Sequence, residues 1–435
     1  MREPYQQPWV EDQVQQTIAL WHSCAAQPMP SGPIFPPSDR LRREAAYDEA
    51  LLAVESELRT ARQSPSGKLA TQARITAVFA RFSALALGLD ESAIQILTEE
   101  FLPVGTALAQ WARRFDPNLS MDSIIQACRN AWTACGLQPL LGEPVHITPS
   151  ILGYSLLYPY SDNYLDRADI TSQTKLHFSR RFRDRLHGHA LPTQDSREEA
   201  LWTMVALIED QYPRPLYPEV YDCLLAIHQA QEDSIAQVNN AKASAAAPDT
   251  ELLRLSCAKG GTSVLADACL GRGSLTGQES QFAFEWGVLL QLGDDLQDIA
   301  EDLERGSITL FSRAAAEGRQ LDSLVLQLLN FSERVGSRME SLPHGTPTLR
   351  HLLRMSWRSL ILGAVANSHQ FFSAGFLEEA EQSSHFGFAF LRSRRERLAS
   401  SHGLYTSLFE AFLEAPPSAN GHLLPPHPPL IEATA

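Results

Sequence analysis

The sequence predicts an all-α protein that forms a single large helical bundle, and three observations support this prediction. Apolar residues recur at helical spacing along most of the 435 residues, whereas alternating, strand-like segments are hard to find. Hydrophobic residues make up 44% and charged residues 20% of the chain, which is typical of a globular protein with a buried core. No repeat of fixed period occurs, which argues against a helical solenoid.

The predicted helices follow one another from the N-terminus. A helix over residues 10–24 ends at a Pro-rich stretch, after which Ser38 or Asp39 is a typical N-cap for a helix to about residue 62. Further helices are expected over 69–87, 91–114, 121–135, 151–166, 172–187, 196–210, 217–239, 249–270, 276–304, 320–341, 347–373, 376–397 and 403–414. We expect residues 1–70 to form an N-terminal helical extension, 71–412 the bundle and 413–435 a Pro-rich disordered tail.

The net charge, the cysteines and the search for targeting signals indicate which classes of protein the sequence fits. The chain has 36 Lys and Arg residues against 51 Asp and Glu residues, a net charge of −15, which argues against a nucleic-acid-binding protein. The six cysteines form no CxxC pair, so we expect buried thiols in a reducing compartment. Neither an apolar signal sequence nor an apolar run of 18 residues is found, which predicts a cytoplasmic protein without a transmembrane segment. The sequence leaves a homodimer open.

A first aspartate cluster lies in the sequence SDNYLDRAD, residues 161–169. Asp162 and Asp166 are four residues apart, so on a helix their carboxylates lie on one face, and Asp169 follows one turn later. Like charges at this spacing repel one another unless a cation lies between them. Mg²⁺ is the natural candidate because it prefers oxygen ligands and commonly joins carboxylates to substrate phosphates.

A second cluster lies in QLGDDLQDIAED, residues 291–302. Asp294, Asp298 and Asp302 repeat every four residues, and Asp295 follows the first of them directly. Aspartate is a poor residue for a helix interior, which favours a metal site. The alternative interpretation is an ordinary amphipathic helix with a solvated acidic face.

Two basic features complete the pattern. The segment KLHFSRRFRDRLHGH, residues 175–189, contains Arg181 and Arg185 and follows the first aspartate cluster. Lys259 lies in the sequence CAKGG, where the two glycines indicate a helix break, a backbone approach to a ligand, or close helix packing. Arginine and lysine bind phosphate oxygens well, although each of these residues is equally compatible with an exposed basic surface.

These motifs resemble a known family. The stretch QLGDDLQDIAEDLERGSITLF (291–311) resembles the second aspartate-rich region of squalene and phytoene synthases, and Asp294-Asp295-x-x-Asp298 is similar to the second motif of chain-elongating prenyl diphosphate synthases. SDNYLD (161–166) resembles the first aspartate motif of the same superfamily, and the separation of 132 residues (294 − 162) is similar to its spacing. The chain therefore resembles class I isoprenoid synthases, in detail over about 150–310.

The resemblance implies a bundle of the class I isoprenoid synthase type with aspartates on two facing helices. Three Mg²⁺ ions would bind between them and hold the diphosphate of an allylic prenyl diphosphate substrate, whose departure leaves a carbocation in an apolar pocket. The implied metal ligands are Asp162, Asp166, Asp294, Asp295, Asp298 and Asp302, of which Asp162, Asp166, Asp294 and Asp298 are expected to be catalytic. The implied diphosphate-binding residues are Arg181, Arg185, Lys259 and Arg305. Candidates for the pocket lining are Tyr154, Tyr158, Phe178, Trp202, Tyr212, Phe282, Phe284 and Trp286.

The chain departs from each branch of the superfamily. The first motif has Ser161-Asp162 in place of a double aspartate, and Asn367-Ser368 lacks the spacing of the Asn/Ser/Glu metal site of cyclases. We expect a Mg²⁺-dependent terpene synthase or cyclase, with a chain-elongating or head-to-head prenyltransferase as the alternative. A non-catalytic helical interaction protein is the alternative of another class. A di-iron protein would need paired Glu-x-x-His motifs, and only Glu143-x-x-His146 occurs.

Overall fold

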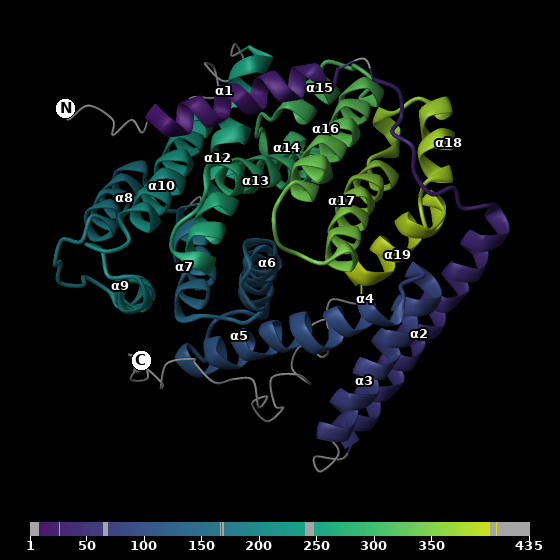
Figure 1. Ribbon diagram of the computed structural model, residues 1–435, viewed down its shortest axis with the longest axis horizontal. Helices are drawn as coiled ribbons and strands as arrows, with labels where there is room; N and C mark the ends of the chain where they lie inside the picture. Colours follow the sequence, from purple (N-terminus) through teal and green to yellow (C-terminus); the bar gives the residue numbers. More distant parts are fainter. Residues whose placement is uncertain are drawn as a thin grey trace.

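The computed structural model describes residues 8–25, 27–63, 68–165, 167, 169–239, 248–400 and 406 (Figure 1). Within these ranges every regular element is a helix and no strand occurs, which confirms the all-α prediction. The α-helices are α1 (Pro8–Ser23), α2 (Pro37–Gln63), α3 (Lys68–Phe82), α4 (Glu91–Gln95), α5 (Leu102–Phe115), α6 (Met121–Leu137), α7 (Pro149–Leu165), α8 (Ser172–Leu186), α9 (Ser196–Gln211), α10 (Pro218–Asn239), α12 (Asp249–Arg272), α13 (Gly277–Gln297), α14 (Ile299–Arg305), α15 (Leu310–Ala316), α16 (Asp322–Glu340), α17 (Pro347–Asn367), α18 (Ala374–Gln382) and α19 (Phe388–Ser400). Short π- and 3₁₀-helical segments are η2 (Ser83–Leu87), η3 (Ile96–Phe101), η4 (Gln138–Leu141) and η5 (His369–Phe371).

Several predicted helices are divided in the structure. The segment predicted as one helix over 276–304 forms α13 and α14, which meet at Asp298 (φ −97°, ψ 9°). Helical hydrogen bonding continues across this junction, because the amide of Asp298 donates to the carbonyl of Asp294 (2.9 Å) and that of Asp302 to the carbonyl of Asp298 (2.8 Å). The segment 91–114 likewise forms α4, η3 and α5. The helix predicted over 403–414 lies outside the described residues except for Thr406.

Local sequence explains where the central helices begin and end. Thr276 caps α13 with a capping box, in which its hydroxyl accepts from the amide of Glu279 while the Glu279 carboxylate accepts from the amide of Thr276. Ser120 caps α6 in the simpler way, by accepting from the amide of Ser123. Gly273 ends α12 with φ of +91°, a conformation in which a side chain would be strained. These caps satisfy amide and carbonyl groups that helix ends leave without partners.

Helices α12 and α13 form the central pair, and glycines set how closely they approach. A Cβ atom on Gly287 would lie 2.0 Å from the carbonyl oxygen of Gly260, and one on Gly261 would lie 2.4 Å from the ring of Phe284. Helix α12 continues through Gly260 and Gly261 without interruption. The helix break considered for the CAKGG sequence is therefore wrong, and the glycines allow close helix packing.

Helix α12 runs antiparallel to α7. The hydroxyl of Ser150 donates to the carbonyl of Leu270 (3.0 Å), and the hydroxyl of Tyr154 donates to the carbonyl of Ser263 (3.3 Å). Residue numbers thus rise along α7 as they fall along α12.

Helix α12 also runs antiparallel to α13. Gly261 lies against Phe284, and one turn and a half earlier in α12 the hydroxyl of Ser256 donates to the carboxylate of Asp295 (2.7 Å). Helices α7 and α13 are therefore parallel to each other. Their C-terminal ends, which carry the two aspartate clusters, lie at the same end of the bundle.

The N-terminal helices belong to the same body as the rest of the chain. Trp21 of α1 is buried, its ring packs against Phe331 of α16, and its carbonyl accepts from Gln327 (2.7 Å). Helices α2 and α3 form a hairpin at the side of the bundle (Figure 1). The boundary predicted at residue 70 falls inside α3, and apolar residues of α1 belong to the main core of the bundle. The predicted tail over 413–435 lies outside the described residues.

The structure bears on two further predictions, which concern the state of the cysteines and the presence of a transmembrane helix. All six cysteines are buried and carry free thiols, as the sequence predicts. Among the helices of the described ranges, none combines the length and the apolar character that crossing a bilayer requires.

Candidate functional site

The second aspartate cluster occupies the junction of α13 and α14. Asp294 is exposed to solvent, whereas Asp298 and Asp302 are half-buried. The hydroxyl of Thr309 donates to Asp302 at 3.4 Å, and no hydrogen bond to another side chain fixes Asp294 within the described residues. Two carboxylates of the cluster, Asp294 and Asp298, are thus available to a ligand.

Asp295 has a different role from its neighbours. Its side chain is only 6% exposed, and its two oxygens accept from Ser256 (2.7 Å) and from Gln291 (2.8 Å). The bond to Ser256 joins the end of α13 to α12. Asp295 therefore joins two helices through its hydrogen bonds, and its role as a metal ligand stays a prediction.

The carboxylates of the cluster raise one another's pKa. Although part of the Asp294 side chain reaches solvent, desolvation by the protein around it and the charges of Asp295 and Asp298 raise its pKa to about 6. Burial and the same two neighbours raise the pKa of Asp302 to about 7. Burial, followed by the charge of Glu301, also raises the pKa of Asp298. Negative charge is thus concentrated in a partly desolvated region, and a bound cation would reduce the repulsion between these carboxylates.

Three basic side chains face this cluster from different helices. Arg129 of α6 and Lys259 of α12 act on Asp294, and Arg395 of α19 together with Arg129 acts on Asp298, in each case lowering the pKa of the carboxyl. In the described part of the chain, none of the three side chains forms a hydrogen bond or an ion pair. These three cations therefore lie near an acidic cluster, but none of them forms an ion pair with its described carboxylates. Of these three residues the sequence analysis names only Lys259, since neither Arg129 nor Arg395 belongs to a motif.

The first aspartate cluster reaches the same end of the bundle. Asp162 lies in the last turn of α7, whereas Asp166 lies outside the described residues. The hydrogen bond from Tyr154 to Ser263 places these two residues at the same level of the antiparallel pair α7 and α12. Asp162 lies eight residues after Tyr154, so it is level with Leu255, which lies eight residues before Ser263. Leu255 precedes Ser256, the residue that binds the end of α13. The helix register therefore brings the backbone of Asp162 to the level of the second cluster.

The three predicted diphosphate-binding arginines are engaged elsewhere. In α8, Arg181 pairs with Glu198 (2.6 Å) and Arg185 with Glu209 (2.7 Å), both carboxylates of α9. Arg305, at the end of α14, is 72% exposed and pairs with Glu301 (2.6 Å). The first two ion pairs join the basic segment of residues 175–189 to α9, away from the second aspartate cluster, whereas the pair of Arg305 lies on α14 beside that cluster.

A metal site complete within the described residues is not formed. No three His, Cys, Asp or Glu side chains among them are placed to share an ion. The side chain of Asp162 and the whole of Asp166 lie outside the described part of the chain.

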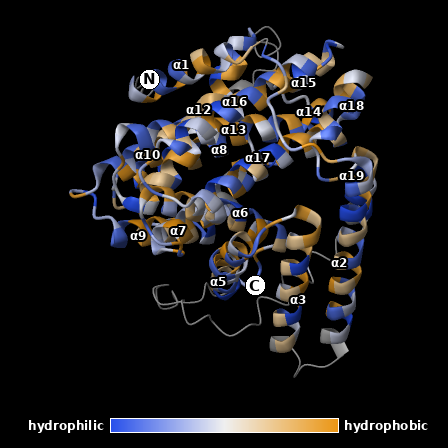
Figure 2. Cartoon of the chain, turned by 45° about the vertical axis from the view of Figure 1, so that its right-hand side comes forward, coloured by the Kyte–Doolittle hydropathy of each residue, from blue (hydrophilic) through white to orange (hydrophobic). Residues whose placement is uncertain are grey.

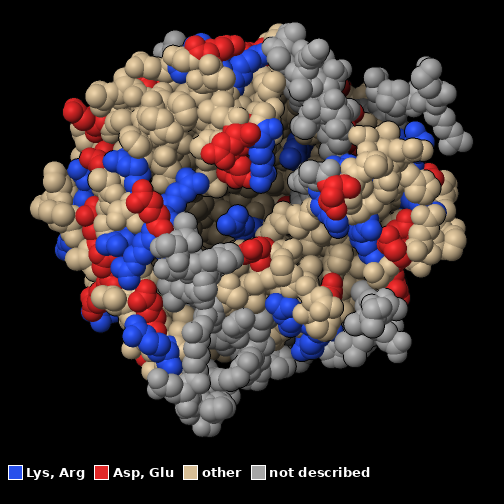
Figure 3. Space-filling model, turned by 180° about the vertical axis from the view of Figure 1, so that it is seen from behind, with Lys and Arg blue, Asp and Glu red and all other residues tan. Residues whose placement is uncertain are grey.

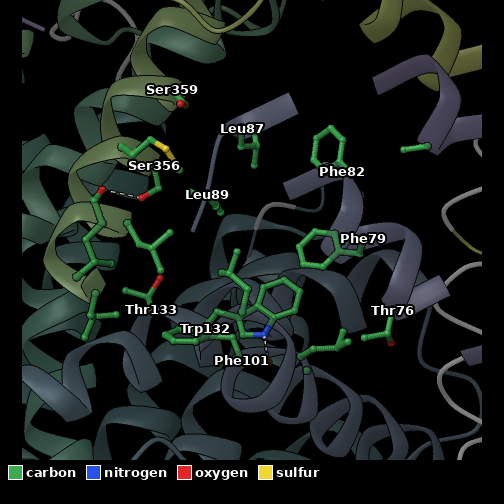
Figure 4. Close-up of a pocket in the computed structure, with 18 of the residues that line it drawn as sticks. Thr76, Phe79, Phe82, Leu87, Leu89, Phe101, Trp132, Thr133, Ser356 and Ser359 are labelled. Atoms are coloured by element: carbon green, nitrogen blue, oxygen red, sulfur yellow. Dashed lines mark hydrogen bonds between the residues drawn. The ribbon is translucent and has the colours of Figure 1, made fainter. Parts of the chain in front are cut away.

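Figure 4 shows a large apolar cavity of about 810 Å³, which lies next to α13 and α6. Trp286 and Leu290 of α13 line it, and Asp294 follows Leu290 by one helical turn on nearly the same face. On α6, Thr133 lines the cavity and Arg129 precedes it by one turn. Charged side chains of both signs also surround a hollow in the surface seen from behind (Figure 3). The cavity wall thus continues into the charged cluster on two helices.

The predicted pocket lining is correct only at Trp286. Tyr154 and Tyr212 donate their hydroxyls to backbone carbonyls, and Phe282 and Phe284 are fully buried between helices. The side chain of Tyr158 lies outside the described residues. Instead, the cavity is lined mainly by α2, α3, α5 and α17. These residues carry no sequence signal beyond being apolar, so they could not be distinguished from core.

Comparison with known proteins adds no relative: the chain matches no protein-family model, and no curated protein or solved structure gives a significant match.

Proposed function

We propose that this protein is a Mg²⁺-dependent isoprenoid synthase of the class I type, acting on an allylic prenyl diphosphate as a terpene synthase. One observation carries the proposal. A single face of α13 passes from the wall of an apolar cavity, at Trp286 and Leu290, to the carboxylates of Asp294 and Asp298. A substrate with a hydrocarbon chain and an anionic head needs this combination of surfaces.

The carboxylates fit the metal that the proposal requires. The charge of Asp298 raises the pKa of Asp294, both carboxylates offer hard oxygen ligands, and the register brings the backbone of Asp162 to the same level. Bound Mg²⁺ would neutralise the charge that develops on the departing diphosphate. Asp295 would hold the end of α13 in place through Ser256 rather than bind the ion.

The uncommitted cations fit the anionic head of the substrate. Arg129, Lys259 and Arg395 would donate to diphosphate oxygens. In the reaction the allylic C–O bond breaks, both of its electrons leave with the diphosphate, and the positive charge remains on the hydrocarbon. The cavity would exclude water until the carbocation loses a proton or closes a ring. Its aromatic side chains, such as Trp286 and Trp357, would stabilise the cation by their π-electrons.

The test is diphosphate release by the purified full chain with Mg²⁺ and a panel of allylic prenyl diphosphates, with and without isopentenyl diphosphate. We expect release and a hydrocarbon or alcohol product from a single allylic substrate. Asp298→Asn should lower the rate more than about a hundredfold. Glu304→Gln, an exposed carboxylate on α14, is the matched control and should leave the rate unchanged.

Each other outcome has a defined meaning. Longer diphosphates that form only with isopentenyl diphosphate would indicate chain elongation, and a product of doubled carbon number would indicate head-to-head condensation. Full activity of Asp298→Asn would contradict the metal assignment. No release from any substrate, with Mg²⁺ having no effect on stability, would favour a non-catalytic helical protein.

A further inference from the structure

The cavity has two walls that come from different parts of the chain. One wall is formed by the bundle, through α5, α6, α13 and α17. The other is formed by the hairpin of α2 and α3, which contributes Tyr47, Ala50, Leu51, Val54, Ile75, Thr76, Val78, Phe79 and Phe82. Figure 4 shows Phe79 and Phe82 opposite Trp132 and Ser356 across the open space. The hairpin therefore sets the far side of the cavity.

The hairpin is held in place by contacts that do not fill the cavity. Asp48 of α2 pairs with Arg394 of α19 (2.6 Å), and Glu44 accepts from the amide of Gly387 (2.7 Å). The ring of Tyr47 packs against Phe390 at 5.5 Å between centroids. Polar and aromatic contacts with α19 thus fix the position of α2.

The hairpin leaves much of its apolar surface without a packing partner. Its own core in the described residues is small, consisting of Leu58 and Ile75 with Val54 and Leu102 packed against them. Phe79 lines the cavity and is 38% exposed. Figure 2 shows apolar residues along the two helices of the hairpin. An apolar surface that encloses a cavity continuous with an anion-binding end is suited to the hydrocarbon chain of the same ligand.

Three of the hydroxyl groups around the cavity donate to carbonyl groups of their own helices. Thr106 donates to the carbonyl of Leu102 (3.0 Å), Thr133 to that of Arg129 (3.2 Å) and Ser356 to that of Leu353 (2.8 Å). Each hydroxyl proton is therefore used within its own helix. Trp132 likewise donates its indole N–H to the carbonyl of Phe101 (2.8 Å). These groups present little hydrogen-bonding capacity to a ligand, so the cavity favours hydrocarbon.

The volume indicates the size of that hydrocarbon. A water molecule occupies about 30 Å³ in the liquid, and a carbon of a hydrocarbon chain occupies a similar volume. A cavity of about 810 Å³ therefore holds roughly 27 such groups. This is more than a chain of 15 or 20 carbons requires.

We propose that the α2–α3 hairpin determines substrate size, and that the cavity accepts a prenyl chain of about 25 carbons in preference to shorter chains. This inference rests on the proposed function for the identity of the head group. The size preference itself is a property of the cavity. It can therefore be measured on the metal-free protein with prenyl alcohols, which cannot release diphosphate.

The experiment measures binding of the 15-, 20- and 25-carbon prenyl alcohols to the full chain by quenching of tryptophan fluorescence. Trp132, Trp286 and Trp357 line the cavity and report occupancy. We expect the 25-carbon alcohol to bind at least about tenfold more tightly than the 15-carbon alcohol, because each buried methylene adds to affinity. Equal binding of the three alcohols would overturn the proposal.

Variants test the role of the hairpin. Ala50→Phe places a ring in the cavity from α2 and should weaken binding of the 25-carbon alcohol about tenfold or more, with less than about a threefold effect on the 15-carbon alcohol. Ala45→Phe, at an exposed position of the same helix, is the matched control and should change neither. If Ala50→Phe fails to fold, Thr76→Phe makes the same test from α3. A variant that folds and weakens all three alcohols equally would overturn the size-determining role.

The outcomes separate the two proposals. If the alcohols rank by length but no diphosphate is released in the presence of Mg²⁺, the proposed enzymatic function fails and the size assignment stands. If diphosphate is released but the alcohols bind equally, the function stands and the size assignment fails.

Discussion

Replacing Gly287 by alanine should weaken the central contact of the bundle. A Cβ at this position would lie 2.0 Å from the carbonyl oxygen of Gly260, whereas a carbon and an oxygen in contact are usually about 3.3 Å apart. The two backbones would have to separate by about 1 Å, since no side chain can rotate away. Overpacking of this kind costs up to about 3 kcal/mol, and the better helix propensity of alanine returns about 1 kcal/mol. We expect a net loss of about 2 kcal/mol in the free energy of unfolding.

Urea titration followed by circular dichroism and tryptophan fluorescence measures this loss as a lower midpoint at unchanged slope. Gly363→Ala in α17 is the matched control, because its Cβ meets no atom within 4 Å, and should gain about 0.5–1 kcal/mol. Gly261→Ala should cost less than Gly287→Ala, since the opposing group is the ring of Phe284, which can shift. A Gly287→Ala protein as stable as the original would refute the argument that the glycines are required for close packing.

Three further predictions concern charge. Burial raises the pKa of Asp267 well above 3.8, although the hydrogen bond from Asn130 lowers it, so the folded state binds the proton more tightly and stability falls as pH rises above about 4. Asp267→Asn should therefore be more stable than the original protein at pH 7 and no more stable at pH 3, as measured by urea titration. Arg395→Gln should raise the KM for an allylic diphosphate about tenfold, whereas Arg305→Gln, which removes an exposed pair, should change it less than about twofold. Mg²⁺ at a hundred times its Kd should add about 2.7 kcal/mol to the free energy of unfolding. Equal gains for the original protein and Asp298→Asn would contradict the metal assignment.

The helical architecture could be predicted because its signals are local. Periodic apolar residues and N-caps such as Ser120 act within one or two turns, so the sequence contains them directly. The packing role of Gly260 could only be named as one of several alternatives, because its partner Gly287 is distant in the sequence. Division of the helix at Asp298 was not predicted, since the same residues also fit an uninterrupted helix.

The charged residues show most clearly what the tertiary structure decided. Arg181 and Arg185 look free in the sequence, yet each pairs with a carboxylate of α9 that only helix packing brings within reach. Arg129 and Arg395 belong to no motif, yet packing places them beside the acidic cluster, where they form no hydrogen bond or ion pair with the other described residues. No local rule distinguishes these two sets of arginines.

The adjacent residues Asp294 and Asp295 illustrate the difference between what the sequence determines and what the tertiary structure decides. The sequence by itself determined that acidic residues recur at helical spacing near the end of one helix. A helix turns by about 100° per residue, so neighbouring side chains point in different directions, but their surroundings depend on the neighbouring helices. Packing placed Ser256 of α12 against Asp295 and left Asp294 exposed next to the cavity. The position of α12, and of the hairpin that closes the cavity, results from contacts between distant segments, which the order of residues along one helix does not contain.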